Sequence, residues 1–568
     1  MPKRTLAPEA SMNFRPDQLL RHFYLATLTG AVAVLGTIYA IHNTDFHHWG
    51  FVLGTALDFI HGRELFTQVY VQYGAGLLLL FDAINHVWPI TYTSIGLLTS
   101  IVYAATLVVI FLSIEKLSST KYAIALTIIA FLFHPYAIFP WPDYYAGFCL
   151  SLACYLLLPN GNAPTNTRDV IAGTLLFLAF LFRNTYLINL LAGASAYFAL
   201  SLLYPKLKDT RATTAIAAFL VLVALYLCFL SVQGQLTFWY RENFGAATTL
   251  YGLGGGSVGK LLLTLFSPYD IPTAAFTAAL WVNVYIVVLI LGRARSTGAL
   301  DPMGSGMTLF LVTLGAAGIA QALQFYEPFR LQNACSPLYL GVACFLSWHP
   351  PVQSPALRRP PAIFVLATLI VALACKAPNL FNGHALSTIW PLIEKPRDFF
   401  NQPLQGAAAR TTTYAWSEGI PVFQGHRFLP DVQNYYRSLS NILCGSDKKI
   451  VNLTNDSMVP YVCPGARNAL YLPMYPYGML QQISPEQRNR VMLGQWELDE
   501  LIVADAAPPV AKNRRLVQFE SVARPYQVRW APVNKRVWIF AVEARNAEAG
   551  VDPSQGTRNS ADIGHPPH

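Results

Sequence analysis

The sequence predicts a polytopic α-helical membrane protein with juxtamembrane helices and a smaller C-terminal α/β domain. Of its 568 residues, 54% are hydrophobic and only 12% are charged, and the mean hydropathy is +0.38. Soluble domains usually carry about 25% charged residues, so a mainly soluble protein is excluded. From about residue 380 the apolar runs shorten and charged residues return, which marks the start of a second domain.

A membrane-spanning helix needs roughly 20 mostly apolar residues. Eleven runs in the first two thirds of the chain meet or approach this length, so we expect about 11 transmembrane helices. The runs are 22–41, 91–114, 121–140, 143–158, 169–182, 184–204, 212–233, 271–292, 306–325, 335–348 and 361–377.

The segment 74–88, GAGLLLLFDAINHVW, is excluded from this set. Its apolar core is short, and Asp82, Asn85 and His86 follow at helical spacing. Because a charge at the bilayer centre costs at least about 2.5–3.5 kcal/mol, we expect an amphipathic helix at the membrane surface.

Charge distribution then orients the chain. If 74–88 does not span, most Lys and Arg residues of the membrane domain fall in the leader and in the loops on its side. The positive-inside rule places the N-terminus in the cytoplasm and loop 42–73 outside. The net charge of +9 therefore reflects orientation and does not indicate nucleic-acid binding. The predicted parts are a cytoplasmic leader (1–21), a membrane domain (22–377) with a first outside loop and its juxtamembrane helices (42–90), an extracytoplasmic domain (378–543) and a disordered tail (544–568).

The C-terminal domain is expected to alternate strands and helices, as small α/β domains do. Strand-like segments are 449–454, 466–474, 498–506 and 535–543, and helical patterns are 430–444 and 484–495. Cys444 and Cys463 flank the first of these strands. An extracytoplasmic compartment permits disulfides, so these two cysteines are candidates for a bridge.

Loop 42–73 holds the densest group of ionisable residues before residue 380. Asp45 follows the first apolar run closely, where a carboxylate at headgroup level can take a proton from a sugar hydroxyl. The same residue is also a good helix N-cap, and the local sequence leaves both interpretations open. No cofactor is certain. His47 and His48, beside Asp45, make a divalent metal ion the one candidate, although no metal-binding motif accompanies them.

The second outside loop, HPYAIFPWPDYY, contains Asp143 and Tyr144. A carboxylate and aromatic rings can bind a sugar, but Trp and Tyr also form belts at membrane surfaces. Both interpretations remain open.

Arg183, Arg241 and Arg330 lie on the predicted outer side of the membrane. Guanidinium groups bind phosphate bidentately, although each of the three can also be a snorkelling interface residue. The segment GGGSVGKL (254–261) approaches a nucleotide phosphate-binding loop, but Leu261 stands where Ser or Thr is required. We reject a nucleotide site and expect a glycine-rich loop from which Lys260 can reach a phosphate.

These features together resemble the GT-C superfamily of membrane glycosyltransferases. The matching segments are TDFHHWG after the first span, LDFIHGRELFTQVYVQYGAGLLLLFDAI, PWPDYY and NLTNDSMVPYVC in the terminal domain. The resemblance matches Asp45 to the catalytic base, Asp143 to a second acidic position, and Arg183 and Arg330 to donor-phosphate contacts. A second carboxylate next to Asp45 is absent, and histidines stand there instead.

The resemblance implies an inverting transfer of a sugar from a polyprenyl-phosphate donor in a bacterial inner membrane. The expected partners are this lipid-linked donor, membrane lipids and a glycan, lipid or protein acceptor. A polysaccharide polymerase or ligase is the first alternative, and a transporter the second. A transporter usually places ionisable residues near the midplane, whereas here they gather at one surface.

Overall fold

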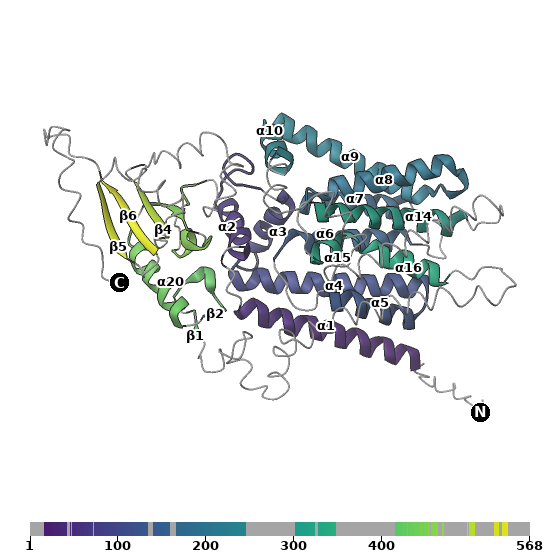
Figure 1. The fold of residues 1–568 in the computed structure, drawn as a ribbon, viewed down its shortest axis with the longest axis horizontal. Helices are drawn as coiled ribbons and strands as arrows, with labels where there is room; N and C mark the ends of the chain where they lie inside the picture. Colours follow the sequence, from purple (N-terminus) through teal and green to yellow (C-terminus); the bar gives the residue numbers. More distant parts are fainter. Residues whose placement is uncertain are drawn as a thin grey trace, which may run out of the picture.

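The computed structural model describes a helical bundle and a small β-sheet that lies beyond one end of the bundle (Figure 1). It describes residues 16–42, 46, 48–71, 73–133, 140–158, 166–245, 302–323, 328–347, 415–417, 419–428, 430–446, 448–454, 456–463, 468–470, 497, 499–505, 527–532 and 537–543.

Long apolar runs form the helices of the bundle. Within it, α6 packs against α4 and α7, α1 against α4, α7 against α9, and α8 against α14. The bundle helices are α1 (Pro16–His42), α4 (Tyr92–Leu117), α5 (Thr120–Phe133), α6 (Pro142–Leu157), α7 (Asn166–Phe182), α8 (Tyr186–Leu203), α9 (Thr210–Val232), α14 (Pro302–Ala317), α15 (Pro328–Ala334) and α16 (Pro337–Ser347).

Nine of the predicted runs coincide with these helices, and the runs 271–292 and 361–377 lie outside the described residues. The run 335–348 corresponds to α16, which the short α15 precedes. Among the described helices, α1, α4, α8 and α9 are long and apolar enough to cross a membrane.

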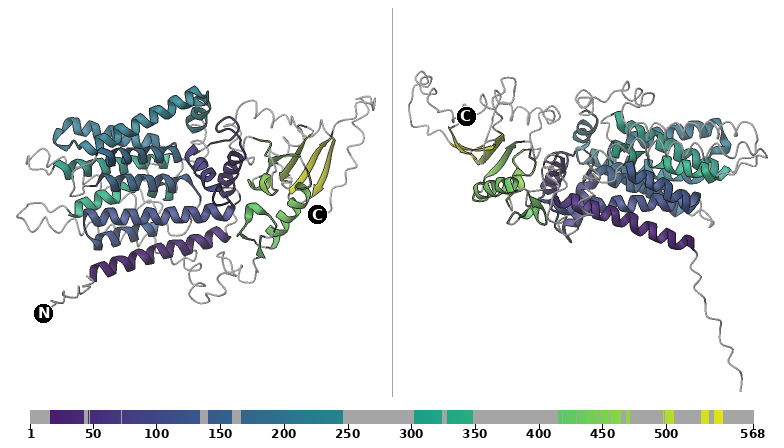
Figure 2. Two further views of the ribbon diagram at one scale, coloured as in Figure 1. Left: turned by 180° about the vertical axis from the view of Figure 1, so that it is seen from behind. Right: turned by 60° about the horizontal axis from the view of Figure 1, so that its bottom comes forward.

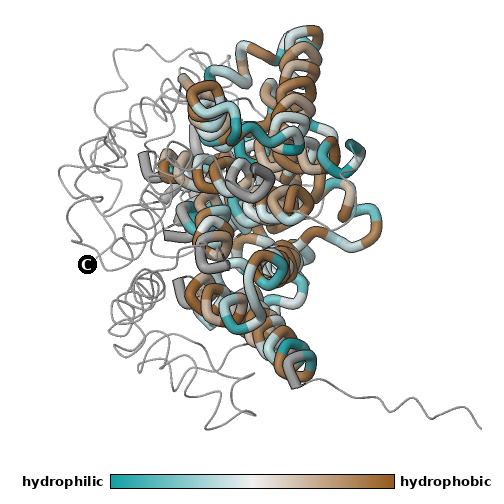
Figure 3. Tube along the Cα trace, turned by 90° about the vertical axis from the view of Figure 1, so that its right-hand side faces the viewer, coloured by the Kyte–Doolittle hydropathy of each residue, from teal (hydrophilic) through white to brown (hydrophobic). Residues whose placement is uncertain are grey.

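The outward faces of the bundle are apolar. Leu202 and Val232 are more than 80% exposed, and Phe23, Ile101 and Leu225 are more than 60% exposed. Seen along the bundle, apolar residues, coloured brown, run round the helices rather than along one inner stripe (Figure 3). Helices that are hydrophobic on all sides are typical of membrane spans.

Two short helices lie at the end of the bundle that faces the sheet, α2 (His48–Ile60) and α3 (Ala75–Asn85) (Figure 1). At 1.5 Å per residue, the 11 residues of α3 reach about 16 Å, roughly half of a bilayer core. The helix observed in segment 74–88 is therefore too short to span.

The chain beyond residue 414 contributes α20 (Pro430–Leu443) and a four-stranded mixed sheet, seen from two further sides in Figure 2. The strand order is β3-β4-β6-β5, with β3 parallel to β4 and the other two pairs antiparallel. The strands are β3 (Lys449–Leu453), β4 (Glu500–Asp505), β5 (Gln527–Pro532) and β6 (Val537–Glu543). Strand β5 and two strands of two residues each were not predicted from the sequence, namely β1 (Ala415–Trp416) and β2 (Arg427–Phe428). Of the predicted strand 466–474, Asn468 forms an isolated bridge with Ile450.

Cys444 and Cys463 are joined by a disulfide between the end of α20 and the segment after β3. They are 19 residues apart in the chain. A disulfide that closes a loop of this length reduces the conformational entropy of the unfolded chain, which stabilises the folded state by about 3 kcal/mol. Cys444→Ser is therefore expected to lower the free energy of unfolding by about that amount.

The same bond tests the orientation of the chain, because disulfides persist outside the cytoplasm and are rare within it. Alkylation of intact cells before reduction is expected to leave both sulfurs unlabelled, with labelling only after reduction. Cys228, a free and exposed cysteine on α9, is the internal control, because its labelling in the denatured protein shows that the reagent reacts with free thiols. Labelling of both Cys444 and Cys463 without reduction would contradict an extracytoplasmic location.

Candidate active site

An aromatic cluster joins the bundle to the C-terminal segment at a seam that begins beside α2. Phe46 lies 5.1 Å from Tyr436, 5.6 Å from Tyr92 and 5.9 Å from Phe423, measured between ring centroids. Its carbonyl oxygen accepts a hydrogen bond from the backbone N–H of Ser457 at 3.2 Å. The residue that follows Asp45 in the chain is therefore fixed between the two parts of the molecule.

Trp49, one turn later, fixes the start of α2 on α4. Its indole stacks on Tyr92 at 5.3 Å, and its Nε1 donates to the Tyr92 carbonyl oxygen at 3.1 Å. Gly96 makes this approach possible, since a Cβ there would overlap the indole ring. The sequence TDFHHWG thus supplies aromatic anchors on both sides of its histidines.

Asp58 and Arg63 form a second link across the seam. Arg63 donates to Asp58 Oδ2 at 2.8 Å and to the carbonyl oxygen of Leu470 at 3.0 Å. Asn468 Nδ2 also donates to Asp58 Oδ2, at 3.1 Å. Burial raises the pKa of Asp58 to about 6, and the nearby Arg63 opposes that shift without cancelling it.

This pKa predicts a pH dependence of stability. Because the folded-state pKa lies above the ordinary 3.8, the native state binds more protons than the unfolded state between about pH 4 and 6. Protonation of Asp58 adds on the order of 3 kcal/mol to the free energy of unfolding. This contribution is fully present below about pH 4 and is lost as the pH rises through 6. Asp58→Asn keeps an acceptor for Arg63 and is expected to remove this slope from unfolding curves measured across pH 4 to 7.5. An identical slope in both proteins would refute the assignment.

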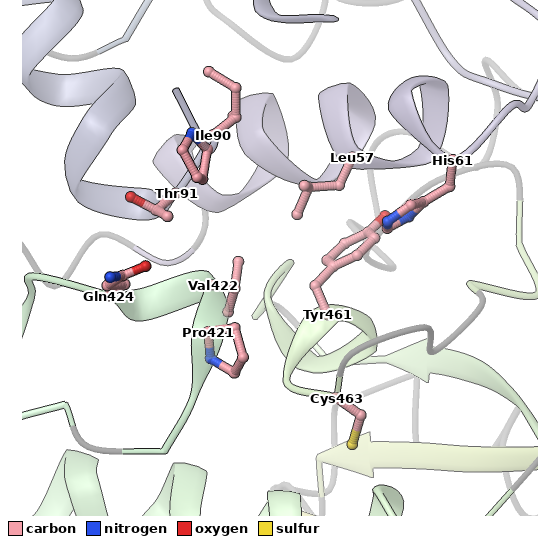
Figure 4. Close-up of a pocket in the computed structure, with 10 residues that line it drawn as sticks. Leu57, His61, Ile90, Thr91, Pro421, Val422, Gln424, Tyr461 and Cys463 are labelled. Carbon is pink, nitrogen blue, oxygen red and sulfur yellow. The ribbon is translucent and has the colours of Figure 1, made fainter. Parts of the chain in front are cut away.

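A pocket of about 200 Å³ lies in the same seam (Figure 4). Leu57 and Ile90 from the bundle side face Pro421 and Val422 from the C-terminal segment. Polar side chains stand at both ends, Thr91 and Gln424 at one and His61 and Tyr461 at the other. Its apolar walls and few polar groups are like those of small-molecule sites, but its volume is below the roughly 300–1,000 Å³ usual for them.

Asp143 and Arg183 meet inside the bundle, at the end nearest the seam. Arg183 Nε lies 3.5 Å from Asp143 Oδ1, and both side chains are at most 1% exposed. Asp143 stands in the first turn of α6, where a negative charge is favoured by the helix dipole. Arg183 occupies the three-residue connection between α7 and α8. Buried charges are stable only when paired, so each residue requires the other.

Two aromatic rings extend this pair to Arg330. The Arg183 guanidinium lies 4.5 Å from the centre of the Tyr73 ring, and Arg330 lies 5.8 Å from the Trp141 ring. Tyr73 and Trp141 contact each other edge-on at 4.9 Å. Each guanidinium group thus packs on one of two rings that contact each other, and both arginines are buried. A cation packed on an aromatic face is stabilised more strongly where water is excluded.

The loop that carries Tyr73 is pressed against the end of α7. Gly74 has a φ of +153°, and a Cβ there would overlap the carbonyl oxygens of Leu181 and Phe182. The Tyr73 carbonyl oxygen accepts from the Asn184 N–H at 2.6 Å. The glycine in QYGAG is therefore required by the close approach of two backbones.

The other predicted site residues have separate positions. Arg241 packs on Phe238 at 5.3 Å, with no described contact to Arg183 or Arg330. Tyr144 is fully buried and packs edge-on against Tyr103 at 5.6 Å, which gives it a packing role in the bundle. Asp45, His47 and Lys260 lie outside the described residues, and so does the side chain of His48, the first residue of α2. Among the described residues, no group of three His, Cys, Asp or Glu residues could hold a metal ion.

Sequence reasoning missed Tyr73, Trp141 and Glu242 as parts of the site. Glu242 had a usable signal, because its charge follows the apolar run 212–233 within the short polar segment RENF. The aromatic residues had none, because their roles depend on which arginine the fold places beside them.

Comparison with known proteins identifies the fold. No family model matches the sequence, and no curated protein does. The structure resembles that of ArnT from Cupriavidus metallidurans bound to undecaprenyl phosphate, with a TM-score of 0.50, 10% sequence identity, and coverage of 93% of this chain and 99% of ArnT. The archaeal oligosaccharyltransferase AglB from Archaeoglobus fulgidus, in complex with an inhibitory peptide and a dolichol-phosphate, gives a TM-score of 0.42 at 10% identity, over 94% of this chain and 75% of that chain. A score below 0.5 supports no further argument. The likeness to ArnT confirms the GT-C-like, mostly helical fold expected from the sequence.

Proposed function

Because the chain has a GT-C-type fold, we propose that it is an integral-membrane glycosyltransferase that takes its sugar from a polyprenyl-phosphate donor. The ArnT structure that shares this fold holds undecaprenyl phosphate, a carrier lipid of the kind that the proposed donor releases after transfer. The acceptor is a glycan, lipid or protein at the outer face of a bacterial inner membrane.

One observation, in addition to the fold, supports binding of a lipid phosphate. Arg183, from the α7–α8 connection, and Arg330, from α15, pack on Tyr73 and Trp141, two rings that contact each other, and Asp143 pairs with Arg183. Guanidinium groups at a poorly solvated bundle end are suited to bind the phosphate of a lipid whose tail lies in the bilayer. We propose that these two arginines bind the donor phosphate.

The proposed reaction is an inverting displacement. Asp45 accepts the proton of an acceptor hydroxyl, whose oxygen forms a bond to the anomeric carbon of the sugar. The bond from that carbon to the phosphate oxygen breaks on the opposite face, and the lipid phosphate leaves with the electron pair. Arg183 and Arg330 stabilise the charge that develops on it, an interaction of the kind that often dominates catalysis.

The proposed orientation places the seam outside. The first residues of α1 and the sheet lie at opposite ends of the bundle, which supports a cytoplasmic N-terminus and an extracytoplasmic C-terminal domain (Figure 1). Phe46 and α2, both within loop 42–73, lie at the sheet end, where a donor displayed on the outer leaflet and an acceptor in the periplasm can meet.

A donor-consumption assay distinguishes this function from its alternatives. The purified protein in nanodiscs is incubated with polyprenyl-phosphate sugars, polyprenyl-pyrophosphate glycans and an extract of envelope lipids and glycans. We expect release of free polyprenyl phosphate from the first donor class. Release of polyprenyl pyrophosphate would instead indicate a polymerase or ligase. Sugar movement into sealed proteoliposomes without cleavage of either donor would indicate a transporter.

A further inference from the structure

Glu242 is a buried carboxyl group that the proposed reaction does not use. It lies in the π-helical turn Arg241–Gly245 after α10 (Leu236–Tyr240) and is 3% exposed. Its Oε2 accepts a hydrogen bond from the backbone N–H of Val71 at 3.1 Å. Val71 lies two residues before Tyr73, so Glu242 holds the loop that presents Tyr73 to Arg183.

The same turn holds the α7–α8 connection. Asn184 Nδ2 donates to Asn243 Oδ1, and Asn243 Nδ2 in turn donates to the Trp239 carbonyl oxygen at 2.8 Å. Asn184 also donates its backbone N–H to the Tyr73 carbonyl oxygen. One turn of chain thus fixes both the segment before Tyr73 and the residue next to Arg183.

The surroundings of Glu242 favour its uncharged form, which acts as a hydrogen-bond acceptor. Burial raises its pKa well above the ordinary range, and the N–H of Val71 and the charge of Arg241 oppose that shift only in part. Tyr70 is the other titratable group that interacts with it, and the pKa of Tyr70 is likewise raised, first by burial and then by Glu242. A neutral carboxyl group accepts a backbone hydrogen bond as an amide does.

We propose that Glu242 is a positioning residue for donor binding, acting through the Val71–Tyr73 loop to hold Tyr73 against the guanidinium of Arg183. The inference rests on the proposed function, in which Arg183 binds the donor phosphate. Glu242 itself neither contacts the donor nor transfers a proton.

Binding of undecaprenyl phosphate to the full-length protein in nanodiscs tests this role. Glu242→Ala is expected to weaken binding about tenfold, the approximate value of one desolvated cation–π contact. Glu242→Gln keeps the acceptor for Val71 and is expected to bind as wild type does. In a Tyr73→Ala background, which already lacks the ring, Glu242→Ala is expected to have no further effect.

Three results would overturn the proposal. A loss of binding in folded Glu242→Gln would show that the charge or the proton of Glu242 matters. An equal tenfold loss from Glu242→Ala with and without Tyr73 would show that it does not act through that ring. Wild-type affinity in Glu242→Ala would show that the loop needs no such support. Thermal unfolding identifies any unfolded variant. If Glu242→Ala does not fold, folded Tyr73→Ala decides the question, because a tenfold loss of binding supports the role of the ring and wild-type affinity overturns it.

Arg183→Ala, measured in parallel, separates this inference from the proposed function. If Arg183→Ala binds undecaprenyl phosphate like wild type, the proposed phosphate site is wrong. If Arg183→Ala loses binding while Glu242→Ala and Tyr73→Ala bind like wild type, the phosphate site stands and the positioning role is wrong.

Discussion

Replacing Asp45 with asparagine is expected to lower the rate of sugar transfer about 10²- to 10⁴-fold, because the acceptor hydroxyl loses its general base. Asparagine is nearly isosteric and also caps helices well, so the alternative role of Asp45 as an N-cap predicts little change in rate or stability. The measurement is sugar transfer from a polyprenyl-phosphate donor, together with thermal unfolding.

One matched variant and one binding measurement sharpen that result. Asp58→Asn removes another carboxylate from the same outside loop, one that accepts hydrogen bonds from Arg63 and Asn468. This variant is expected to retain sugar transfer at neutral pH. Binding of undecaprenyl phosphate by Asp45→Asn is expected to equal that of wild type, since the base contacts the acceptor. Full transfer activity in Asp45→Asn would exclude the general-base role.

Arg183→Ala is expected to reduce transfer by about 10²- to 10³-fold, the usual effect of removing one group that stabilises developing charge. It also leaves Asp143 buried without its ion-pair partner, which is expected to cost about 3–5 kcal/mol of stability. The loss of activity must therefore be separated from the loss of fold.

The double variant Arg183→Ala with Asp143→Asn achieves this separation. It removes both charges, so most of the stability is expected to return while transfer and undecaprenyl phosphate binding do not. Arg21→Ala is a control at the other end of α1, where Arg21 pairs with Glu115 at a half-exposed surface site. Recovery of transfer together with stability in the double variant would show that Arg183 has only a structural role.

Much of the bundle could be predicted from the sequence because apolar run length is a local property. The runs that become α4 and α6 to α9 were located within a few residues, and segment 74–88 forms a helix of only 11 residues, as its short apolar core predicts. Strand β5 escaped prediction because QVRWAP has charge and proline within six residues and owes its conformation to pairing with β6.

The candidate site was predictable only in part. Arg183 and Arg330 were recognisable because arginine flanked by apolar sequence is costly and needs a partner. Their pairing with Asp143, Tyr73 and Trp141 depends on helix packing, which no spacing in the chain encodes. Arg241 has the same sequence character, yet it packs on its own turn against Phe238.

The most direct test of the central claim is the lipid that the protein itself retains. Wild type and Asp45→Asn, purified from their native membrane, are analysed by mass spectrometry of bound lipids. The account predicts a polyprenyl-phosphate sugar bound to Asp45→Asn, which binds the donor but does not consume it, and its loss when Arg183→Ala is added. Phospholipids alone in both proteins, with no polyprenyl-phosphate species, would contradict it.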